Sequence, residues 1–420
     1  MLKKNNFKIC VLGLGYVGFP LYQELSKKFD VVGYDVNKNR VRELLRGTDK
    51  TGEFSKSNIN KKKLKLYSLE KEVPPSNVYI VTVPTPIDNE KNPDLRFLKK
   101  ASLFISKRLN RKDLVIYEST TYPGCTRNFC VPILEKSGLK SIEDFGFGYS
   151  PERINPSSKV NKLSNTIKVI SASDKNSLKK VKTIYGKIIH AGLYEAETIE
   201  VAEASKLVEN CQRDINIAFM NELSVIFNKL NIDTSEVLKA SSTKWNFLPF
   251  KPGLVGGHCI SVDPYYLSYI ASETGRRSKI INLSRHVNED LSNTIIDSLT
   301  SLSESKLQRK LKSVLILGAS FKENCPDTRN SKVFDIYRIL KSKKVNVKII
   351  DPIAVNSENK SIPISKNIRG LQGIDAIILA VPHSQIINKY KKKIIEFHKN
   401  GGIVIDIKSV LKKENSDGRL

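Results

Sequence analysis

The chain has 420 residues, enough for two or three domains that each bury a hydrophobic core. Hydrophobic residues make up 40% of it and charged residues 27%, so a collagen-like, low-complexity or largely disordered chain is excluded. The formal net charge is +27, but the lysines are scattered and form no basic stripe interleaved with aromatic residues, which indicates a solvated surface rather than a nucleic-acid site.

The six cysteines have neither the density of a disulfide framework nor the spacing of paired metal ligands. We therefore expect reduced thiols, no bound metal and a cytoplasmic protein. The first 21 residues resemble a secretory signal, yet three glycines interrupt their apolar stretch and no small-residue cleavage site follows. Because no other run reaches the roughly 18 apolar residues of a membrane span, we expect no membrane association.

Strands and helices alternate over the first 120 residues. Apolar runs rich in β-branched residues predict strands at residues 7–12, 31–34, 78–83 and 114–118. Helical spacing of apolar residues predicts helices at residues 20–28, 38–46 and 95–109. This alternation is typical of a doubly wound domain with a parallel sheet.

Residues 198–230 predict one long helix. Its apolar residues recur every three or four positions, at Leu207, Cys211, Ile215, Phe219, Leu223, Ile226 and Leu230. A helix of this length spans about 50 Å, so we expect it to bridge two domains and to pack against a second subunit in a homodimer. Asp233 and Glu236 resemble a capping box at the start of the next helix.

The last 110 residues repeat the alternating pattern. They predict a strand at 313–317, a helix at 332–341 and strands at 345–350 and 374–381. The turn after the first of these strands has one glycine, so we do not expect it to hold a dinucleotide pyrophosphate as a three-glycine turn does. Residues 414–420 are expected to fray. The predicted fold class is α/β, with two doubly wound parallel-sheet (Rossmann-like) domains joined by a long central helix.

A GxGxxG motif lies between the first predicted strand and helix, with the sequence Gly13-Leu14-Gly15-Tyr16-Val17-Gly18. Glycines at these places allow a tight turn, close approach of the backbone to a pyrophosphate and tight packing of the helix, whose N-terminal amides face the anion. A glycine-rich turn without a ligand is the alternative, which the register of strand, turn and helix disfavours.

Asp35 ends the second predicted strand, 22 residues after Gly13. A carboxylate at this place accepts hydrogen bonds from the ribose hydroxyls and repels a 2′-phosphate, which favours NAD over NADP. Lys38 and Arg40 lie close by and weaken this preference slightly.

Two further polar loops follow predicted strands: Pro84-Thr85-Pro86 and residues 118–124 with Thr120. Residues 149–156, with Glu152 and Arg153, form another polar, proline-bounded loop. Ligands of open α/β sheets bind at the carboxyl ends of strands, although each loop alone is also compatible with an ordinary turn.

On the long helix, Lys206, Asn210 and Arg213 occupy an arc of about 60°, apart from the apolar stripe. The face they form is either solvated or functional.

Residues 253–266 are rich in glycine and contain His258, Cys259 and Asp263. Isolated cysteines are usually small core residues, but a glycine-rich setting favours a reactive thiol. His258 and Cys259 are adjacent and no second ligand pair accompanies them, which argues against zinc.

Taken in order, these motifs resemble the UDP-glucose and UDP-N-acetylhexosamine 6-dehydrogenases over nearly the whole chain. The motifs are GLGYVG, VPTPID, YESTTYPG, YSPERINP, KLVENCQRDINIAFMNE, GLVGGHCISVDPYYL and SFKENCPDTRNS. The branch it is most similar to oxidises UDP-N-acetylglucosamine for Vi polysaccharide. The UDP-glucose branch carries a second glutamate where Pro156 stands here, so a different sugar is expected.

The resemblance implies a four-electron oxidation of the sugar C6 alcohol to a carboxylate with two NAD in succession, in surface polysaccharide synthesis. Cys259 would form a thiohemiacetal and then a thioester. A thiol with an ordinary pKa of about 8.5 needs help to ionise, which Lys206 would give, and Lys206 and Asn210 would stabilise an oxyanion. Asp263 as general base and Thr120 would activate water, and Glu152 would assist proton transfer.

The resemblance also implies binding residues. Those expected for NAD are Gly13, Gly15, Tyr16, Val17, Gly18, Asp35, Arg40, Pro84, Thr85 and Thr120. Those expected for the UDP-sugar are Glu152, Arg153, Lys206, Asn210, Arg213, Gly256, His258, Lys322 and Arg329. The implied domains are an NAD-binding domain at 1–196, a central helical domain at 197–300 and a UDP-sugar-binding domain at 301–420.

Several alternatives stay open. The substrate could be UDP-glucose or UDP-N-acetylmannosamine, and the sequence does not rank UDP-N-acetylglucosamine against its galacto epimer. The aromatic segment Trp245–Phe250 favours an acetamido group at C2. A single-step hydroxyacid dehydrogenase would not need Cys259, and a nucleic-acid-binding protein would leave the glycine motif and Asp35 unused.

Overall fold

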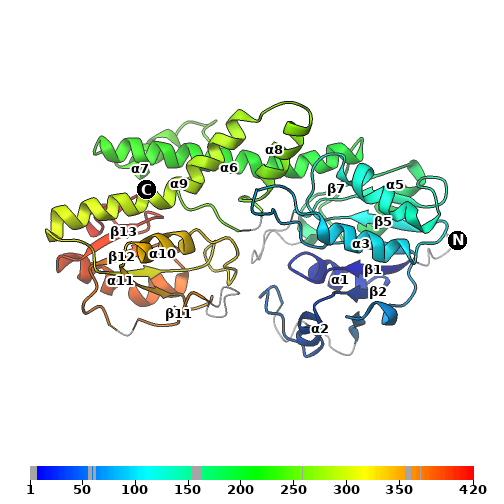
Figure 1. The fold of residues 1–420 in the computed structure, drawn as a ribbon, viewed down its shortest axis with the longest axis horizontal. Coiled ribbons are helices and arrows are strands. Elements are labelled where there is room, and N and C mark those ends of the chain that lie inside the picture. The colour runs from blue at the N-terminus through cyan, green and yellow to red at the C-terminus, as the bar shows by residue number, and fades with distance from the viewer. Residues whose placement is uncertain are drawn as a thin grey trace. The chain divides into compact units, whose positions relative to one another are not determined.

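The computed structural model describes residues 7–54, 59, 63–153, 163–257, 259–354, 361–368 and 370–420. His258 and Pro156 of the sequence-predicted site lie outside these residues. The chain divides into two compact units, residues 1–209 with 265–277 and residues 210–264 with 278–420. Helix α6 (Ile199–Lys229) runs through the boundary and joins the two units (Figure 1).

The described part of the first unit contains an eight-stranded sheet with the order β3-β2-β1-β4-β5-β6-β7-β8. The strands are β1 (Lys8–Leu12), β2 (Asp30–Tyr34), β3 (Leu66–Tyr67), β4 (Val78–Val81), β5 (Leu114–Tyr117), β6 (Gly146–Tyr149), β7 (Lys168–Ala172) and β8 (Leu193–Glu195). The first six are parallel, whereas β7 pairs with β6 in the antiparallel sense and β8 runs parallel to β7. The order in which successive strands are added to the sheet reverses between β1 and β4, and doubly wound sheets bind ligands at such a point.

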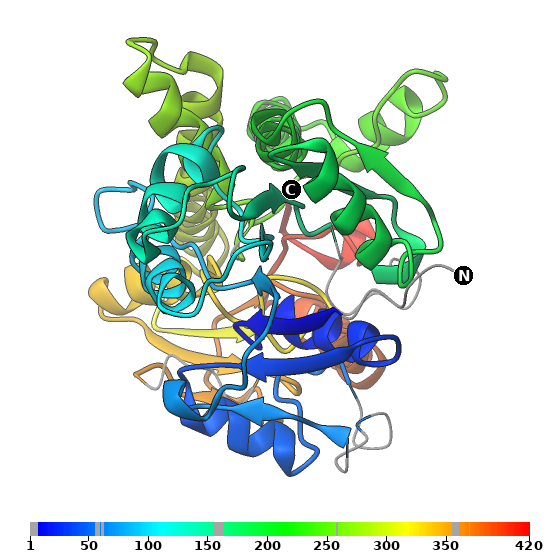
Figure 2. The same ribbon diagram turned by 90° about the vertical axis from the view of Figure 1, so that its right-hand side faces the viewer.

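Helices cover both faces of this sheet because successive strand side chains point to opposite faces. Cys10 and Leu12 of β1 share a core with α3 (Arg96–Ser106) and α4 (Val131–Leu134). Ile9 and Val11 share the other core with α1 (Gly18–Ser26), α2 (Lys38–Leu45) and α5 (Lys175–Tyr185). Figure 2 shows β1 and β2 side by side at the first unit's parallel sheet.

The second unit has a parallel sheet with the order β11-β10-β9-β12-β13-β14 among its described residues. The strands are β9 (Ser313–Leu317), β10 (Asn346–Ile350), β11 (Ile364–Ser365), β12 (Ala376–Leu379), β13 (Ile403–Asp406) and β14 (Gly418–Arg419). Helices α9 (Lys279–Leu307) and α10 (Val333–Ser342) pack on one face and α11 (Ser384–Lys399) on the other. The predicted fold class is confirmed.

One prediction about the second unit differs from the structure. The tail does not fray, because β14 pairs with β13 and Asp417 binds both the Val404 amide and the Lys306 ammonium. In the apolar stripe of α6, Leu207 and Cys211 are buried, whereas the later residues Phe219, Ile226 and Leu230 are exposed.

Two short helices complete the architecture. Asp233 caps α7 (Thr234–Ser241) by accepting hydrogen bonds from the Ser235 and Glu236 amides, and α8 spans Asp263–Glu273. Among the described residues, we find no helix with the length and apolar character needed to cross a membrane.

Candidate functional site

The glycine turn after β1 uses its three glycines for different reasons. Gly13 has a φ of +91°, and a Cβ there would lie 2.9 Å from the Thr82 carbonyl oxygen. A Cβ on Gly18 would lie 1.8 Å from the Gly13 carbonyl oxygen. A Cβ on Gly15 would have no neighbouring atom within 4 Å. Packing within the protein therefore explains Gly13 and Gly18, whereas Gly15 keeps a space open in front of the turn.

The N-terminus of α1 adjoins this space. Its N-cap residue is Val17, whose side chain makes no capping hydrogen bond. Valine is a poor N-cap, the Phe19 amide donates to the Gly15 carbonyl at 3.2 Å and Pro20 has no amide hydrogen, so of the first three positions it is the Gly18 amide to which an anion fits. Together with the open space at Gly15, the turn fits the pyrophosphate of a dinucleotide.

Asp35 follows β2 and is partly exposed. Its Oδ2 accepts a hydrogen bond from the Leu14 amide at 2.8 Å, and its Oδ1 accepts one from the Asn37 amide at 2.8 Å. Each carboxylate oxygen has a second lone pair, so the exposed side of Asp35 can still accept hydrogen bonds from ribose hydroxyls.

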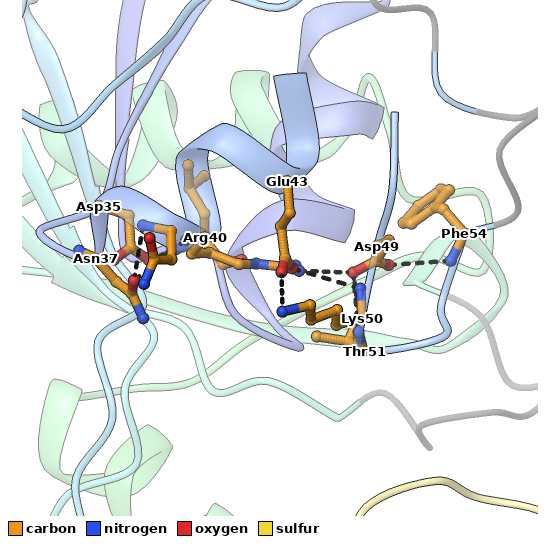
Figure 3. A network of polar contacts seen from close by, with 10 residues as sticks. Asp35, Asn37, Arg40, Glu43, Asp49, Lys50, Thr51 and Phe54 are labelled. Atoms are coloured by element: carbon orange, nitrogen blue, oxygen red, sulfur yellow. Dashed lines mark hydrogen bonds and ion pairs between the residues drawn. The ribbon is translucent and has the colours of Figure 1, made fainter. Parts of the chain in front are cut away.

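Arg40 lies in a network that Figure 3 shows from close by. Its Nε donates to the Leu14 carbonyl at 2.7 Å, and its guanidinium pairs with Glu43 at 2.5 Å and Asp49 at 2.8 Å. The Asp49 side chain is fully buried. The two carboxylates offset the positive charge of Arg40 and so weaken its attraction for a 2′-phosphate. The hydrogen bond to the Leu14 carbonyl holds Arg40 at the glycine turn.

The loops after β4 and β5 meet the glycine turn. The Thr82 hydroxyl donates to the carbonyls of Leu12 and Gly13 at 2.9 and 2.8 Å, and the Ser119 hydroxyl donates to the Val83 carbonyl at 2.7 Å. Pro84, Thr85 and Thr120 follow in these loops and are exposed or partly exposed. The structure therefore places these three predicted residues at the same edge of the sheet as the turn.

Glu203 on α6 anchors the loop that contains Thr120. Its buried carboxyl group accepts hydrogen bonds from the amides of Gly124 at 2.6 Å and Thr126 at 2.9 Å. Burial raises the pKa of Glu203 to about 7, although both hydrogen bonds act in the opposite direction. Glu203 precedes Lys206 by one helical turn, and nothing in the sequence pattern distinguished it from other helix glutamates.

A second buried polar group, also missed from the sequence, surrounds Glu152. The Lys168 ammonium lies 2.9 Å from Glu118 and 3.4 Å from Glu152, and the Tyr185 hydroxyl donates to Glu118. The only signal was a single lysine inside an apolar run. Arg153, by contrast, turns to Glu209 on α6, at 2.8 Å.

In the second unit, Cys259, Asp263 and Asn210 come together. The Asp263 amide donates to the Cys259 carbonyl at 2.8 Å, and the Asn210 side-chain amide donates to the Asp263 carboxylate at 2.5 Å. Asn210 and Asp263 are buried, whereas Cys259 is partly exposed. Arg213 is exposed, and its guanidinium donates to the side-chain Oδ1 of Asn210 at 3.4 Å. A partly exposed cysteine four residues before a buried carboxylate that an amide side chain holds suits covalent chemistry on a carbonyl group.

The segment containing Cys259 is fixed at its beginning. Asn221 of α6 accepts from the Gly253 amide at 2.7 Å and donates to the Gly253 carbonyl at 3.2 Å. A Cβ on Gly256 would lie 2.6 Å from the Asn330 carbonyl oxygen, and Gly257 lies against the Phe321 ring. These two glycines therefore let the segment approach the loop after β9.

A cavity of about 320 Å³ opens in the second unit beside this segment. Its lining includes Gly256, Glu323 and three lysines, Lys322, Lys332 and Lys408. The lining follows the carboxyl ends of β9, β12 and β13, and the lysines suit a phosphate-bearing ligand. Arg329, a predicted substrate residue, is not among the lining residues and forms a two-point ion pair with Asp327, at 2.6 Å in its closest contact.

The second sheet also has an acidic residue after its second strand, Asp351, but His383 covers it. Asp351 Oδ2 binds His383 Nε2 at 2.9 Å and the Ala319 amide at 2.7 Å. Burial opposes ionisation of Asp351, yet the hydrogen bonds and charge of His383 outweigh it and lower the pKa to about 2. Asp351 is buried and makes its hydrogen bonds within the domain, so its carboxylate is not accessible to a ribose.

Sequence models of the UDP-glucose/GDP-mannose dehydrogenase family match three stretches of the chain. The NAD binding domain matches residues 7–189, the central domain 200–290 and the UDP binding domain 315–413. The chain belongs to this family.

Two relatives of this dehydrogenase are similar over their full length. It is 46% identical over 423 residues to the UDP-N-acetyl-D-glucosamine 6-dehydrogenase of Salmonella typhi, covering 99% of each chain. It is 44% identical over 416 residues to protein CapL of Staphylococcus aureus, covering 98% of this chain and 97% of CapL. A solved structure, the UDP-D-ManNAc dehydrogenase of Pyrococcus horikoshii, is 27% identical with a TM-score of 0.84, covering 97% of this chain and 96% of that one.

Family membership confirms three expectations. The chain is an NAD-dependent nucleotide-sugar dehydrogenase, its cofactor is NAD and its fold is that of the family. The open space at Gly15, the uncapped start of α1 and the accessible side of Asp35 fit this cofactor.

Proposed function

We propose that this dehydrogenase oxidises the C6 alcohol of a UDP-N-acetylhexosamine, UDP-N-acetylglucosamine or its galacto epimer, to the uronic acid for surface polysaccharide synthesis. Identity of 44–46% over the whole chain to UDP-N-acetyl-D-glucosamine 6-dehydrogenases and CapL carries this proposal. The grouping of Cys259, Asp263 and Asn210 supports the covalent part of the chemistry.

Two NAD⁺ molecules bound in succession would supply the hydride acceptor for the two oxidation steps, and the residues of this chain would carry out the other steps. Cys259 adds through sulfur to the carbon of the aldehyde, and loss of the second hydride leaves a thioester. Water then attacks the thioester, which releases the carboxylic acid and returns the thiol. Asp263 takes the proton of that water, and the hydrogen bond from Asn210 holds its carboxylate in place.

We assign the remaining predicted roles in the same proposal. Lys206, one turn before Asn210 on α6, stabilises the negative charge that develops on the sugar oxygen. Thr120 orients water and Glu152 assists proton transfer. We infer that Lys322 and the other cavity lysines hold the diphosphate of the nucleotide sugar, with Gly256 at the cavity wall.

Two further parts of the proposal concern organisation. The matched stretches 7–189, 200–290 and 315–413 support the division into domains at 1–196, 197–300 and 301–420. The apolar residues exposed on the second half of α6 support a homodimer.

The preference for an acetamido group rests on the relatives rather than on the aromatic segment. Trp245 is 92% exposed and Leu248 is 53% exposed, so the segment Trp245–Phe250 does not enclose a pocket by itself. The sequence-based argument from this segment therefore finds no support in the second unit.

Steady-state kinetics with UDP-N-acetylglucosamine, its galacto epimer, UDP-N-acetylmannosamine and UDP-glucose test the proposal. We expect two NADH per sugar without free aldehyde, and at least a tenfold higher kcat/KM for an N-acetylated gluco or galacto sugar than for UDP-glucose. Cys259→Ala should form no acid and still bind NAD, whereas Cys130→Ala, a buried cysteine of the first unit, should remain active. One NADH per sugar, or equal efficiency with UDP-glucose, would refute the corresponding part.

A further inference from the structure

Lys168, the first residue of β7, is a buried lysine close to the edge of the sheet at which ligands bind. Its side chain is 3% exposed, and its ammonium contacts Glu118, Glu152 and the Pro151 carbonyl. It also lies 5.1 Å from the centre of the Tyr185 ring. Burial removes water from the lysine ammonium group, so a lysine in such surroundings stays charged only next to negatively charged partners.

The reversed direction of β7 explains how Lys168 reaches this place. In the antiparallel pairing of β6 and β7, Tyr149 lies opposite Ser171 and Gly148 opposite Ala172. Continued past the end of β6, the same register sets Glu152 opposite Lys168. The start of β7 therefore lies at the carboxyl end of β6, the edge of the sheet at which the loop with Glu152 begins.

The group contains more negative than positive charge. Two carboxyl groups, Glu118 and Glu152, share one ammonium, and the hydroxyl of Tyr185 is the fourth titratable member. Burial raises the pKa of Glu118 to about 7, the charge of Lys168 lowers it and Glu152 raises it again. A structural ion pair would need only one carboxylate, so stability alone does not account for the second.

Glu152 is held on both oxygens. Its Oε2 faces the Lys168 ammonium and its Oε1 accepts from the Arg153 amide at 2.7 Å. Resting on the function proposed above, we propose that Lys168 is a positioning residue that keeps the Glu152 carboxyl group oriented and ionised for proton transfer, with Glu118 as the anchor of Lys168. Lys168 itself touches neither sugar nor cofactor in this proposal.

The double variant Glu118→Gln/Lys168→Met tests it, because it replaces the buried pair with uncharged side chains of similar size and is expected to fold. Glu118→Gln alone keeps the ammonium and is the reference. Lys182→Met, which removes the lysine of an exposed pair with Glu195, is the matched control. Relative to the reference, we expect kcat to fall at least tenfold with KM values within about threefold, and the acidic limb of the pH–kcat profile to rise by about one unit.

Infrared spectroscopy provides a readout that needs no turnover. In a pH titration, the protonated carboxyl band that adding Glu152→Gln removes should appear in the double variant at a pH about one unit higher than in the reference. A folded double variant in which neither the pH profile nor the onset of this band differs from the reference would overturn the role of Lys168, even if the wild type makes two NADH per sugar. If the wild type oxidises no UDP-sugar while the band depends on Lys168, the proposed function falls and the control of Glu152 ionisation by Lys168 stands.

Discussion

Gly15→Ala separates cofactor binding from folding at the glycine turn. The φ of Gly15 lies outside the left-handed range, and the added methyl group would meet no atom of the protein within 4 Å. Such a substitution stabilises a protein by about 0.4–1 kcal/mol, because alanine restricts the unfolded chain more than glycine does. The methyl would instead occupy the space where the pyrophosphate approaches the backbone. Losing one hydrogen bond to a charged phosphate costs about 1.5–3 kcal/mol, so NAD should bind at least tenfold more weakly.

The assay measures NAD binding by titration calorimetry and unfolding by scanning calorimetry on the same preparations. Gly18→Ala is the contrasting variant, since its Cβ would lie 1.8 Å from the Gly13 carbonyl oxygen and must displace backbone. We expect Gly18→Ala to lose about 1–3 kcal/mol of stability, as overpacked sites do. Unchanged NAD affinity in a fully folded Gly15→Ala protein would refute the assignment of the open space to the cofactor.

Three further predictions concern other parts of the chain. The wild type should prefer NAD over NADP at least tenfold. The double variant Glu43→Gln/Asp49→Asn should shift the ratio of kcat/KM values toward NADP by about tenfold, because the Arg40 guanidinium is then no longer paired with two carboxylates; an unchanged ratio contradicts this. The lowered pKa of Asp351 contributes about 2 kcal/mol to the free energy of unfolding; this contribution is fully present above pH 4 and is lost as the pH falls toward 2. Between pH 4 and pH 2, the denaturation midpoint of the Asp351→Asn variant should therefore depend less on pH than that of the wild type. Phe219 is 53% exposed, and Phe219→Glu should convert a dimer into monomers in light scattering, whereas a monomeric wild type would remove the homodimer proposal.

The fold was predictable because its signals are local. Buried parallel strands appear as short apolar runs, and the bounds of β9 match the prediction at residues 313–317. The glycine turn and Asp35 lie within one strand-helix-strand unit, so spacing alone relates them. The long helix was predicted at 198–230 and spans 199–229, because its apolar spacing is continuous.

What the sequence could not reveal depends on pairings between distant residues. Lys168 meets Glu118 across 50 positions, and only the reversed direction of β7 brings it there. His383 meets Asp351 across 32 positions, so the acid after β10 looks like a ribose ligand until its partner is known. The short edge strand at Gly418–Arg419 has no hydrophobic run of its own and forms through pairing with β13.

The covering of Asp351 by His383 has a consequence for how the enzyme loads its two nucleotides. The six parallel strands of the first sheet have the same order as the six strands of the second, so a dinucleotide in the cell is in principle a ligand for either. Oδ2 of Asp351 is engaged by His383 and Ala319, and Oδ1 by the Ile353 and Ala354 amides, so this carboxylate is not presented to an adenosine ribose as Asp35 is. We therefore expect NAD to compete only weakly with a sugar nucleotide for the UDP binding domain, so that the concentrations of the two nucleotides can vary with little effect of one on the binding of the other.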